Sequence, residues 1–169
     1  AQDFEILANQ INSKPKDSIQ WIFIGEGRYK NQFRKMLHKQ EKLGQVVFVP
    51  QQSLDKIPSW FAIADYLYLS LRNTPQFSNT VPAKLQSYMA SGKPIIAMLD
   101  GEGERLIKKA ECGLVSKPSN LNELDKVLNQ ALNMNPVIRK NLGKKGLDFY
   151  LENFHSTHRK NQLLDIINT

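Results

Sequence analysis

Residues 79–94 read NTVPAKLQSYMASGKP, and the apolar run PIIAML occupies residues 94–99. Pro82 has a fixed φ and no N–H, so it suits the first turn of a helix, and Thr80 before it suits the N-cap. Gly92 suits the position just after a helix. This segment therefore predicts a helix followed directly by a buried strand. Such a helix start directs free N–H groups and the positive end of the helix dipole outward, where they can bind a phosphate.

Helical and strand-like segments alternate along the rest of the chain. Short, wholly apolar strands are predicted within residues 18–24 and at residues 46–49, 66–71, 94–99 and 113–116. Further helices are predicted at residues 4–11, 28–43, 54–64 and 102–111, and after residue 120, where residues 136–152 and 156–167 form the last two. This pattern predicts an α/β fold, a Rossmann-like doubly wound parallel sheet with helices on both faces and a helical C-terminus. Because residues 4–11 are helical with no strand before them, we expect a missing first strand.

Composition indicates one domain with its own core. The chain has 169 residues, of which 41% are hydrophobic and 23% charged. No run approaches the roughly 20 apolar residues that a membrane span needs, and no signal peptide is visible. Cys112 is the only cysteine, which excludes an internal disulfide and predicts a small buried residue. We expect a cytoplasmic domain whose only membrane contact would be peripheral, at the inner face of the cell membrane.

The net charge of +7 is compatible with nucleic acid, an anionic membrane surface or an anionic small ligand as a partner, and equally with basic residues that are simply solvated. The basic residues are spread along the predicted helices, however, and no basic block with interleaved aromatic residues occurs. A nucleic-acid partner is therefore not expected. The three histidines, His38, His155 and His158, lie on predicted helices without metal-ligand spacing, so no metal site is expected. No G-x-S-x-G elbow for a catalytic serine is present.

Polar turns follow the first four predicted strands. They are GEGR at residues 25–28, PQQS at 50–53, RNTPQFSNTVPAK at 72–84 and DGEGE at 100–104. Ligands of open α/β sheets bind beyond the carboxyl ends of the strands, so these turns should meet at one edge. Glycine turns, a helix start and basic side chains can hold a diphosphate without a metal. Two plainer interpretations remain open: GEGR as a simple tight turn, and Lys84 as a solvated helix residue.

Four segments together resemble the C-terminal domain of family 4 (group 1) retaining glycosyltransferases. They occur in the family's order over nearly the whole chain, at residues 22–50, 63–71, 81–124 and 149–167. The stretch PAKLQSYMASGKPII is similar in particular to members that build bacterial surface polysaccharides. The resemblance implies a GT-B enzyme with two Rossmann-like domains, the C-terminal of which holds most of the nucleotide-sugar donor. Residues 1–169 would then be a single nucleotide-sugar-binding domain, a fragment without its first strand and without the N-terminal acceptor domain.

The resemblance also implies positions for the donor. Gly25 and Gly27 would lie beside the donor, Pro50 and Gln51 would meet the nucleotide base, and main-chain groups at Thr80, Val81 and Pro82 would take the diphosphate, with Lys84 or Arg28 adding charge. No cofactor is implied, since the nucleotide-diphospho-sugar is a substrate.

The chain departs from the family at its pair of glutamates. Their places are taken by Asn79 and Ser87. Ser87 can keep one hydrogen bond to a ribose hydroxyl, a change that costs about 1 kcal/mol, whereas Asn79 puts a neutral amide near the transferred sugar. Counted from Gly101, the position of the family's next glutamate holds Arg105, just after DGEGE. Glu102 therefore either contacts sugar hydroxyls or caps its helix. No catalytic residue is assigned.

The leading hypothesis is a retaining glycosyltransferase of the hexosyltransferase type, which uses a UDP- or GDP-sugar. Its acceptor would be a lipid-linked saccharide of surface polysaccharide synthesis, bound through the missing N-terminal domain, and the isolated fragment would be inactive. Two alternatives remain: a non-catalytic basic domain that binds an anionic polymer or a membrane surface, and a GT-B sugar-nucleotide epimerase.

Overall fold

The computed structural model describes residues 3–15, 18–72, 74 and 78–154. Its strands are β1 (Trp21–Ile24), β2 (Val46–Val49), β3 (Leu67–Ser70), β4 (Ile95–Met98) and β5 (Gly113–Ser116). Its helices are α1 (Phe4–Ser13), α2 (Lys30–Met36), α3 (His38–Lys42), α4 (Ile57–Ile63), α6 (Ala83–Ala90), α7 (Glu102–Ala110), α8 (Leu121–Leu132) and α9 (Pro136–Asn153). The predicted last helix, residues 156–167, lies outside the described residues, as do His155 and His158.

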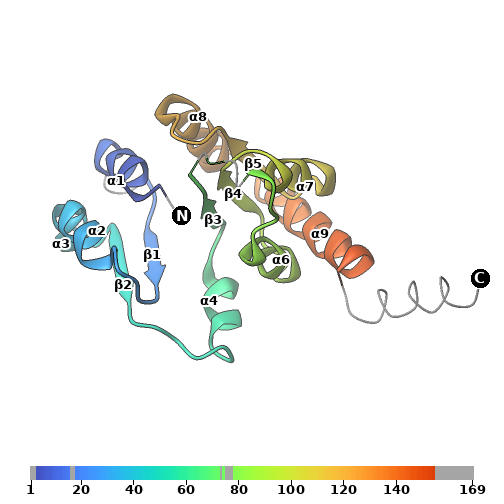
Figure 1. The fold of residues 1–169 in the computed structure, drawn as a ribbon, viewed down its shortest axis with the longest axis horizontal. Coiled ribbons are helices and arrows are strands. Elements are labelled where there is room, and N and C mark those ends of the chain that lie inside the picture. Colours follow the sequence, from blue (N-terminus) through green and yellow to red (C-terminus); the bar gives the residue numbers. More distant parts are fainter. Residues whose placement is uncertain (1–2, 16–17, 73, 75–77, 155–169) are drawn as a thin grey trace, which may run out of the picture.

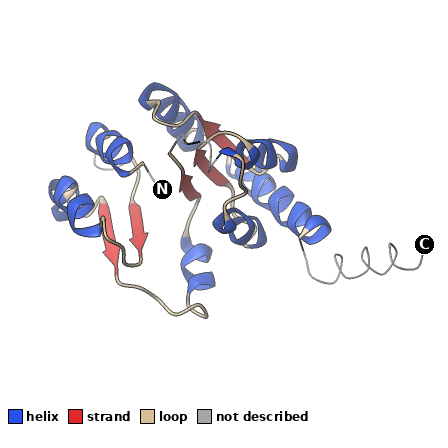
Figure 2. Cartoon of the chain, viewed as in Figure 1, coloured by secondary structure: helices blue, strands red, loops and turns tan. Residues whose placement is uncertain are grey.

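All strand pairs are parallel, and the predicted α/β architecture is confirmed (Figures 1 and 2). The strands form two groups: β1 pairs with β2, and β3, β4 and β5 pair in that order. The register places Trp21 opposite Val46, and Leu67 opposite Ile95. Helices cover the sheets because short parallel strands need apolar partners on each face.

Strand β4 shows why the run PIIAML predicted a buried strand. Its alternate residues Ile96 and Met98 belong to a core cluster with residues of α1 and α8. Ile95 and Ala97 belong to a second cluster with residues of α6 and α7. A strand buried on both faces has no polar positions, so the pattern is apolar throughout.

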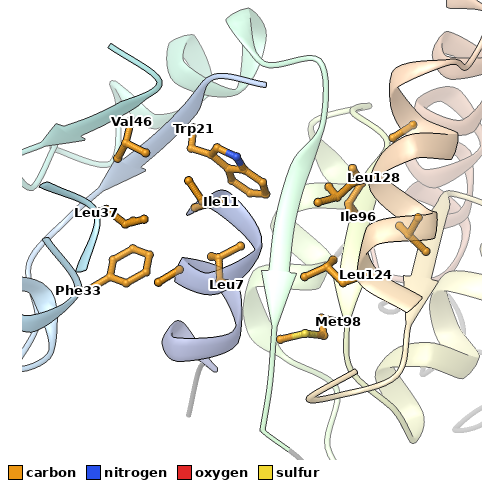
Figure 3. Close-up of a cluster of buried hydrophobic side chains, with 13 residues drawn as sticks. Leu7, Ile11, Trp21, Phe33, Leu37, Val46, Ile96, Met98, Leu124 and Leu128 are labelled. Atoms are coloured by element: carbon orange, nitrogen blue, oxygen red, sulfur yellow. The ribbon is translucent and has the colours of Figure 1, made fainter. Parts of the chain in front are cut away.

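The first cluster crosses from one sheet to the other (Figure 3). Leu7 and Ile11 of α1 lie between the side chains of the β1–β2 pair and those of β4 and α8. The Trp21 ring of β1 meets the Tyr68 ring of β3 edge to face, with 5.4 Å between the centroids. The two groups of strands therefore share one continuous core, although no described strand joins the two sheets.

The prediction of one helix at residues 28–43 is wrong. The segment forms α2 and α3, separated at Leu37, whose φ of −109° and ψ of 13° are not helical. The Leu37 side chain is fully buried in the first cluster. Phe33 and Leu37 are four residues apart and are both buried in this cluster, as residues on one helix face would be.

The start of α6 also differs from the prediction. The helix begins at Ala83, and Pro82 is its N-cap residue, with a ψ of 131°, rather than a member of the first turn capped by Thr80. The Pro82 carbonyl accepts the Leu85 N–H at 2.9 Å and so closes the first turn. At the other end Gly92 has the left-handed φ of 68° predicted for a helix stop. In α4, Pro58 lies in the first turn and does not interrupt the helix.

Two further expectations concern burial and membranes. Cys112 is buried, and burial raises the pKa of its thiol to about 12, so it is an unreactive core residue. None of the described helices combines the length and the apolar character needed to cross a membrane.

Candidate functional site

The turn after β1 leaves open space around its backbone. Gly25 has a φ of +124°, and its N–H donates to the Val49 carbonyl at 3.1 Å. A Cβ at Gly25 or at Gly27 would meet no atom within 4 Å. Glu26 in the same turn pairs with Lys30 at 2.6 Å. Because Gly25 and Gly27 have no side chains and the space in front of them is open, a ligand can contact the main chain of this turn directly.

The turn after β2 lies beside it because β1 and β2 are parallel neighbours with Ile24 opposite Val49. Pro50 and Gln51 follow directly and are both exposed. The Gln52 side-chain amide donates to the Pro50 carbonyl at 3.0 Å. This bond orders the turn and leaves the Gln51 side chain on the surface.

The loop after β3 is fixed to the turn after β4. The Ser78 hydroxyl donates to Asp100 Oδ1 at 2.8 Å. Gly101 has a φ of +71°, and a Cβ there would stand 2.0 Å from the Ser78 carbonyl oxygen. Only glycine fits so close an approach. The sequence analysis missed Ser78 and Asp100, because their contact spans 22 positions and no local pattern indicates it.

The Ser78–Asp100 hydrogen bond and the close approach of Gly101 to Ser78 fix the residues that lead into α6. Asn79, Thr80 and Val81 are exposed, and Pro82 is half-buried. In the first helical turn the Leu85 N–H donates to Pro82, whereas the N–H groups of Ala83 and Lys84 precede the first bond within the helix. The amino end of α6 therefore presents main-chain donors beside an exposed segment.

The outward face of α6 carries Lys84 and Ser87. Both are exposed, whereas Leu85 and Met89 on the inward face are fully buried. Residues three apart lie on the same side of a helix, so Lys84 and Ser87 are neighbours on the surface. Lys84 and Ser87 therefore share one exposed side of α6, and Asn79, also exposed, lies four residues before the helix begins.

A basic residue that the sequence analysis did not single out follows β3. Arg72 is exposed, and its charge acts on Tyr29 in the turn after β1. Tyr29 donates its hydroxyl proton to Glu5 at 2.8 Å, which raises the pKa of Tyr29, while Arg72 opposes that rise. The turns after β1 and β3 are therefore in electrostatic reach of each other. The only signal for Arg72 was its place directly after a strand.

Glu102 is the first residue of α7 and is engaged with its own helix. Its carboxylate accepts from Arg105 at 2.6 Å. Glu104 pairs with Lys108 at 2.7 Å and with Lys117 at 2.8 Å. Glu102 keeps 45% of its side chain exposed, so contact with a sugar hydroxyl remains a prediction.

Other polar features lie apart from these turns. Lys93 donates to the carbonyls of Ala62 and Ala64 at 2.7 and 2.8 Å and so ties the end of α4 to the start of β4. A surface hollow on α2 and α3 contains none of the predicted site residues, and it is lined by Asn31, Arg34, Lys35, His38, Glu41 and Lys42. Within residues 3–154, wherever placement is described, no three His, Cys, Asp or Glu side chains are grouped as metal ligands.

Comparison with known proteins adds a family and a fold. The sequence profile described as "Glycosyl transferases group 1" matches residues 4–162. A search of curated protein sequences gives no match.

Three solved structures are similar in fold. Anabaena Alr3699/HepE in complex with UDP has a TM-score of 0.75 at 19% identity, covering 99% of this chain and 45% of that one. Sucrose-phosphate synthase from Thermosynechococcus elongatus has a TM-score of 0.76 at 18% identity, covering 99% and 42%. A single-residue mutant of S. aureus TarM, in a complex that includes UDP, has a TM-score of 0.73 at 16% identity, covering 99% and 32%. The chain thus spans less than half the length of each.

Proposed function

Because the chain belongs to the group 1 glycosyl transferase family, we propose that it is the donor-binding domain of a retaining glycosyltransferase. The donor is a nucleotide-diphospho-sugar, and the transferred group is a hexosyl unit. The similar structures of HepE and TarM hold UDP, which favours a UDP-sugar over a GDP-sugar. The domain binds the donor in the space bounded by the turns after β1, β2, β3 and β4.

One observation carries this proposal. The Ser78–Asp100 hydrogen bond and the close approach of Gly101 to Ser78 fix the amino end of α6 beside exposed Lys84. A fixed helix start, whose Ala83 and Lys84 N–H groups precede the first bond within the helix, favours an anion. Lys84 and Arg72 add positive charge at the same edge, so a diphosphate is the group that this arrangement fits best.

The remaining contacts in this proposal are those that the family resemblance implies. The nucleotide base lies against Pro50 and Gln51, the ribose meets Ser87, and Asn79 lies near the sugar. As the glycosidic bond to the donor breaks, negative charge grows on the leaving diphosphate. Donors that are already oriented stabilise that charge. This role needs no side-chain nucleophile from the domain, and the proposal includes no metal or other cofactor.

The acceptor belongs to the rest of the enzyme. We propose a saccharide, carried on a lipid and used in surface polysaccharide synthesis at the inner face of the cell membrane, and a second domain that binds it. The described domain alone then binds donor without turning it over.

The test is calorimetric titration of the domain with UDP and GDP. Valine at Gly25 fills the open space in front of the main chain, so Gly25→Val should weaken UDP binding by about tenfold or more, about 1.4 kcal/mol. Gly44→Val is the matched control, since Gly44 also has a positive φ and open space but precedes β2. Thermal unfolding checks that both variants fold. Equal UDP affinity in the two folded variants would contradict the proposal.

A basic surface on α2 and α3 supports a second candidate, binding of an anionic polymer or membrane. Lys35, Lys39 and Lys42 are exposed there, far along the chain from the predicted contacts on α6. The triple change to glutamate should abolish any binding to anionic vesicles and leave UDP affinity unchanged. If the same triple change removes UDP binding, the donor site has been misplaced. A sugar-nucleotide epimerase is separated from a transferase by product analysis with the full-length enzyme.

A further inference from the structure

The segment that runs through β3, α6 and β4 is charged in one sense only. Residues 66–99 contain no Asp or Glu, and their charged side chains are Arg72, Lys84 and Lys93. Lys93 is bound to two carbonyls at the end of α4, at 2.7 and 2.8 Å. Arg72 and Lys84 are therefore the charges that this segment brings to the proposed donor site.

The carboxylates in the neighbouring turns already have partners within the protein. Those after β1 and β4 are engaged as follows: Glu26 with Lys30, Asp100 with Ser78, Glu102 with Arg105, and Glu104 with Lys108 and Lys117. By contrast, Arg72 and Lys84 are exposed and form no ion pair with any residue that the structure describes. A ligand at this edge thus meets free cations and carboxylates that are already bonded.

Arg72 lies where the order of the strands reverses. Across the molecule the order is β2, β1, β3, β4 and β5, so the chain order changes direction between β1 and β3 (Figure 1). Ligands of open α/β sheets bind at such a point, beyond the carboxyl ends of the strands. The Leu71 N–H donates to the Met98 carbonyl at 3.0 Å, which places Arg72 directly after the last bond of the β3 ladder.

Arg72 and Lys84 come to this point from opposite faces of the sheet. Leu71 packs against the second cluster, and successive side chains of an extended segment alternate, so Arg72 follows on the face of the first cluster and of α1. Its charge acts on Tyr29, the N-cap residue of α2, on that same face. Lys84 belongs to α6, which covers the other face. The two cations therefore border the site from two sides.

The side chains between these cations are neutral. Asn79 and Ser87 are exposed, and the segment that contains Asn79 is fixed by the Ser78–Asp100 hydrogen bond. An amide and a hydroxyl can bind sugar hydroxyls but contribute no charge. The start of α6 and Lys84 are enough to hold a diphosphate. A second free cation, on the opposite face, therefore indicates a further negative charge on the ligand.

We propose, on the basis of the function proposed above, that the transferred sugar of the donor is a hexuronic acid and that Arg72 binds its carboxylate. The amino end of α6 and Lys84 then hold the diphosphate, and Asn79 meets the uncharged hydroxyls of the sugar. A guanidinium binds a carboxylate through two parallel hydrogen bonds, which orient the sugar as well as select it. A neutral hexose would leave Arg72 to water.

The experiment is calorimetric titration of the chain with UDP and with two pairs of sugar nucleotides: UDP-glucuronate against UDP-glucose, and UDP-galacturonate against UDP-galactose. At least one uronate should bind about tenfold more tightly than its neutral hexose, because it adds a hydrogen-bonded charge pair. Arg72→Gln should remove that preference and change UDP affinity by less than about threefold, because salt screens a charge that acts only at a distance. Arg72→Lys keeps the charge without the planar fork and should retain part of the preference.

Lys140→Gln is the control for the loss of one positive charge. Lys140 is exposed beside Arg139, whose ion pair with Asp65 places it before β3, at the opposite edge of the sheet. This variant should keep the preference for the uronate.

Two results would overturn the inference and leave the donor-binding function standing. If UDP binds but neither uronate is preferred, no carboxylate is recognised. If Arg72→Gln weakens UDP and every sugar nucleotide by the same factor, Arg72 holds the diphosphate instead. A chain that does not bind UDP at all would overturn the proposed function together with this inference.

Discussion

The two groups of strands differ in how completely their faces are covered. In the β3–β5 group, Ile95 and Ile96 of the central strand are 0% and 5% exposed, so both faces are sealed. In the β1–β2 group, α1, α2 and α3 cover one face, while Ile22 and Val47 on the other remain partly exposed. Within the described chain, the β3–β5 group is therefore packed on both faces, whereas the β1–β2 group is fully packed on one face only.

The same contrast appears in the glycines. A Cβ at Gly113 would meet the Ile95 carbonyl oxygen at 2.1 Å, and one at Gly143 would meet the Gly92 carbonyl oxygen at 2.1 Å. The glycines at residues 25, 27 and 44 have open space instead. In the β3–β5 group glycine permits close packing of backbones; in the β1–β2 group it leaves the main chain accessible.

The largest expected effect compares core residues in the two groups. Leu85→Ala, in α6 under β3, removes a fully buried side chain and should lower the free energy of unfolding by about 3 kcal/mol. Ile22→Ala should lower it by about 1 kcal/mol, because the side chain is already partly in water. Urea unfolding followed by circular dichroism measures both. Equal losses would mean that the two groups are equally packed.

The next prediction concerns glycine at a helix contact. Gly143→Ala forces the α9 backbone away from the turn after α6, an overpacking cost of about 3 kcal/mol that helix propensity reduces by about 1 kcal/mol. We expect a net loss of about 2 kcal/mol in unfolding free energy. Gly27→Ala, with no atom within 4 Å of the new methyl group, should change it by less than about 0.5 kcal/mol. A stable Gly143→Ala protein would show that α9 moves freely.

Much of this fold was predictable because short apolar strands between helices leave a plain pattern. The apolar runs around Ile95 and Val46 marked their strands, and their parallel arrangement followed from the helices between them. The break at Leu37 was not predictable, since residues 28–43 keep helical spacing and only the position of the core decides where the helix must turn.

The site was predictable in outline only. Glycines and polar turns after strands pointed to Gly25 and to the start of α6. The Ser78–Asp100 bond depends on how two loops meet in space, and the place of Pro82 as N-cap depends on a bond to Leu85. Long-range contacts of this kind leave no periodic signal in one sequence.

The third prediction concerns UDP affinity and the contact between Gly101 and Ser78. Gly101→Ala places a methyl group against the Ser78 carbonyl and displaces the segment before α6, so UDP should bind about tenfold more weakly, about 1.4 kcal/mol. Gly92→Ala is the control: it has a similar positive φ, and its Cβ would meet only Leu147 side-chain atoms at 3.7 Å and beyond. Its backbone strain should cost about 1 kcal/mol of stability without weakening UDP binding. Calorimetric titration of both variants separates strain from site geometry.

The smallest effect contrasts two glutamates that form ion pairs. Partial burial acts to raise the pKa of Glu104, but Lys108 and Lys117 outweigh it and lower the pKa below its usual value. A lowered carboxyl pKa gives stability that is present above the unfolded pKa and is lost as pH falls through the folded pKa. Glu104→Gln should therefore lower the Tm at pH 7, by an amount equivalent to at most about 1 kcal/mol, and the difference from the unaltered chain should disappear once the pH has fallen through the lowered pKa of Glu104.

Glu26→Gln is the matched change in the β1–β2 group. Glu26 also pairs with a lysine, but 55% of its side chain is exposed, so solvent screens the pair. Its Tm difference from the unaltered chain should be close to zero at every pH. If the Tm difference for Glu104→Gln stays the same in acid, the loss comes from packing. In acid Glu104 is protonated and its ion pairs are already gone, so the charge no longer explains a difference.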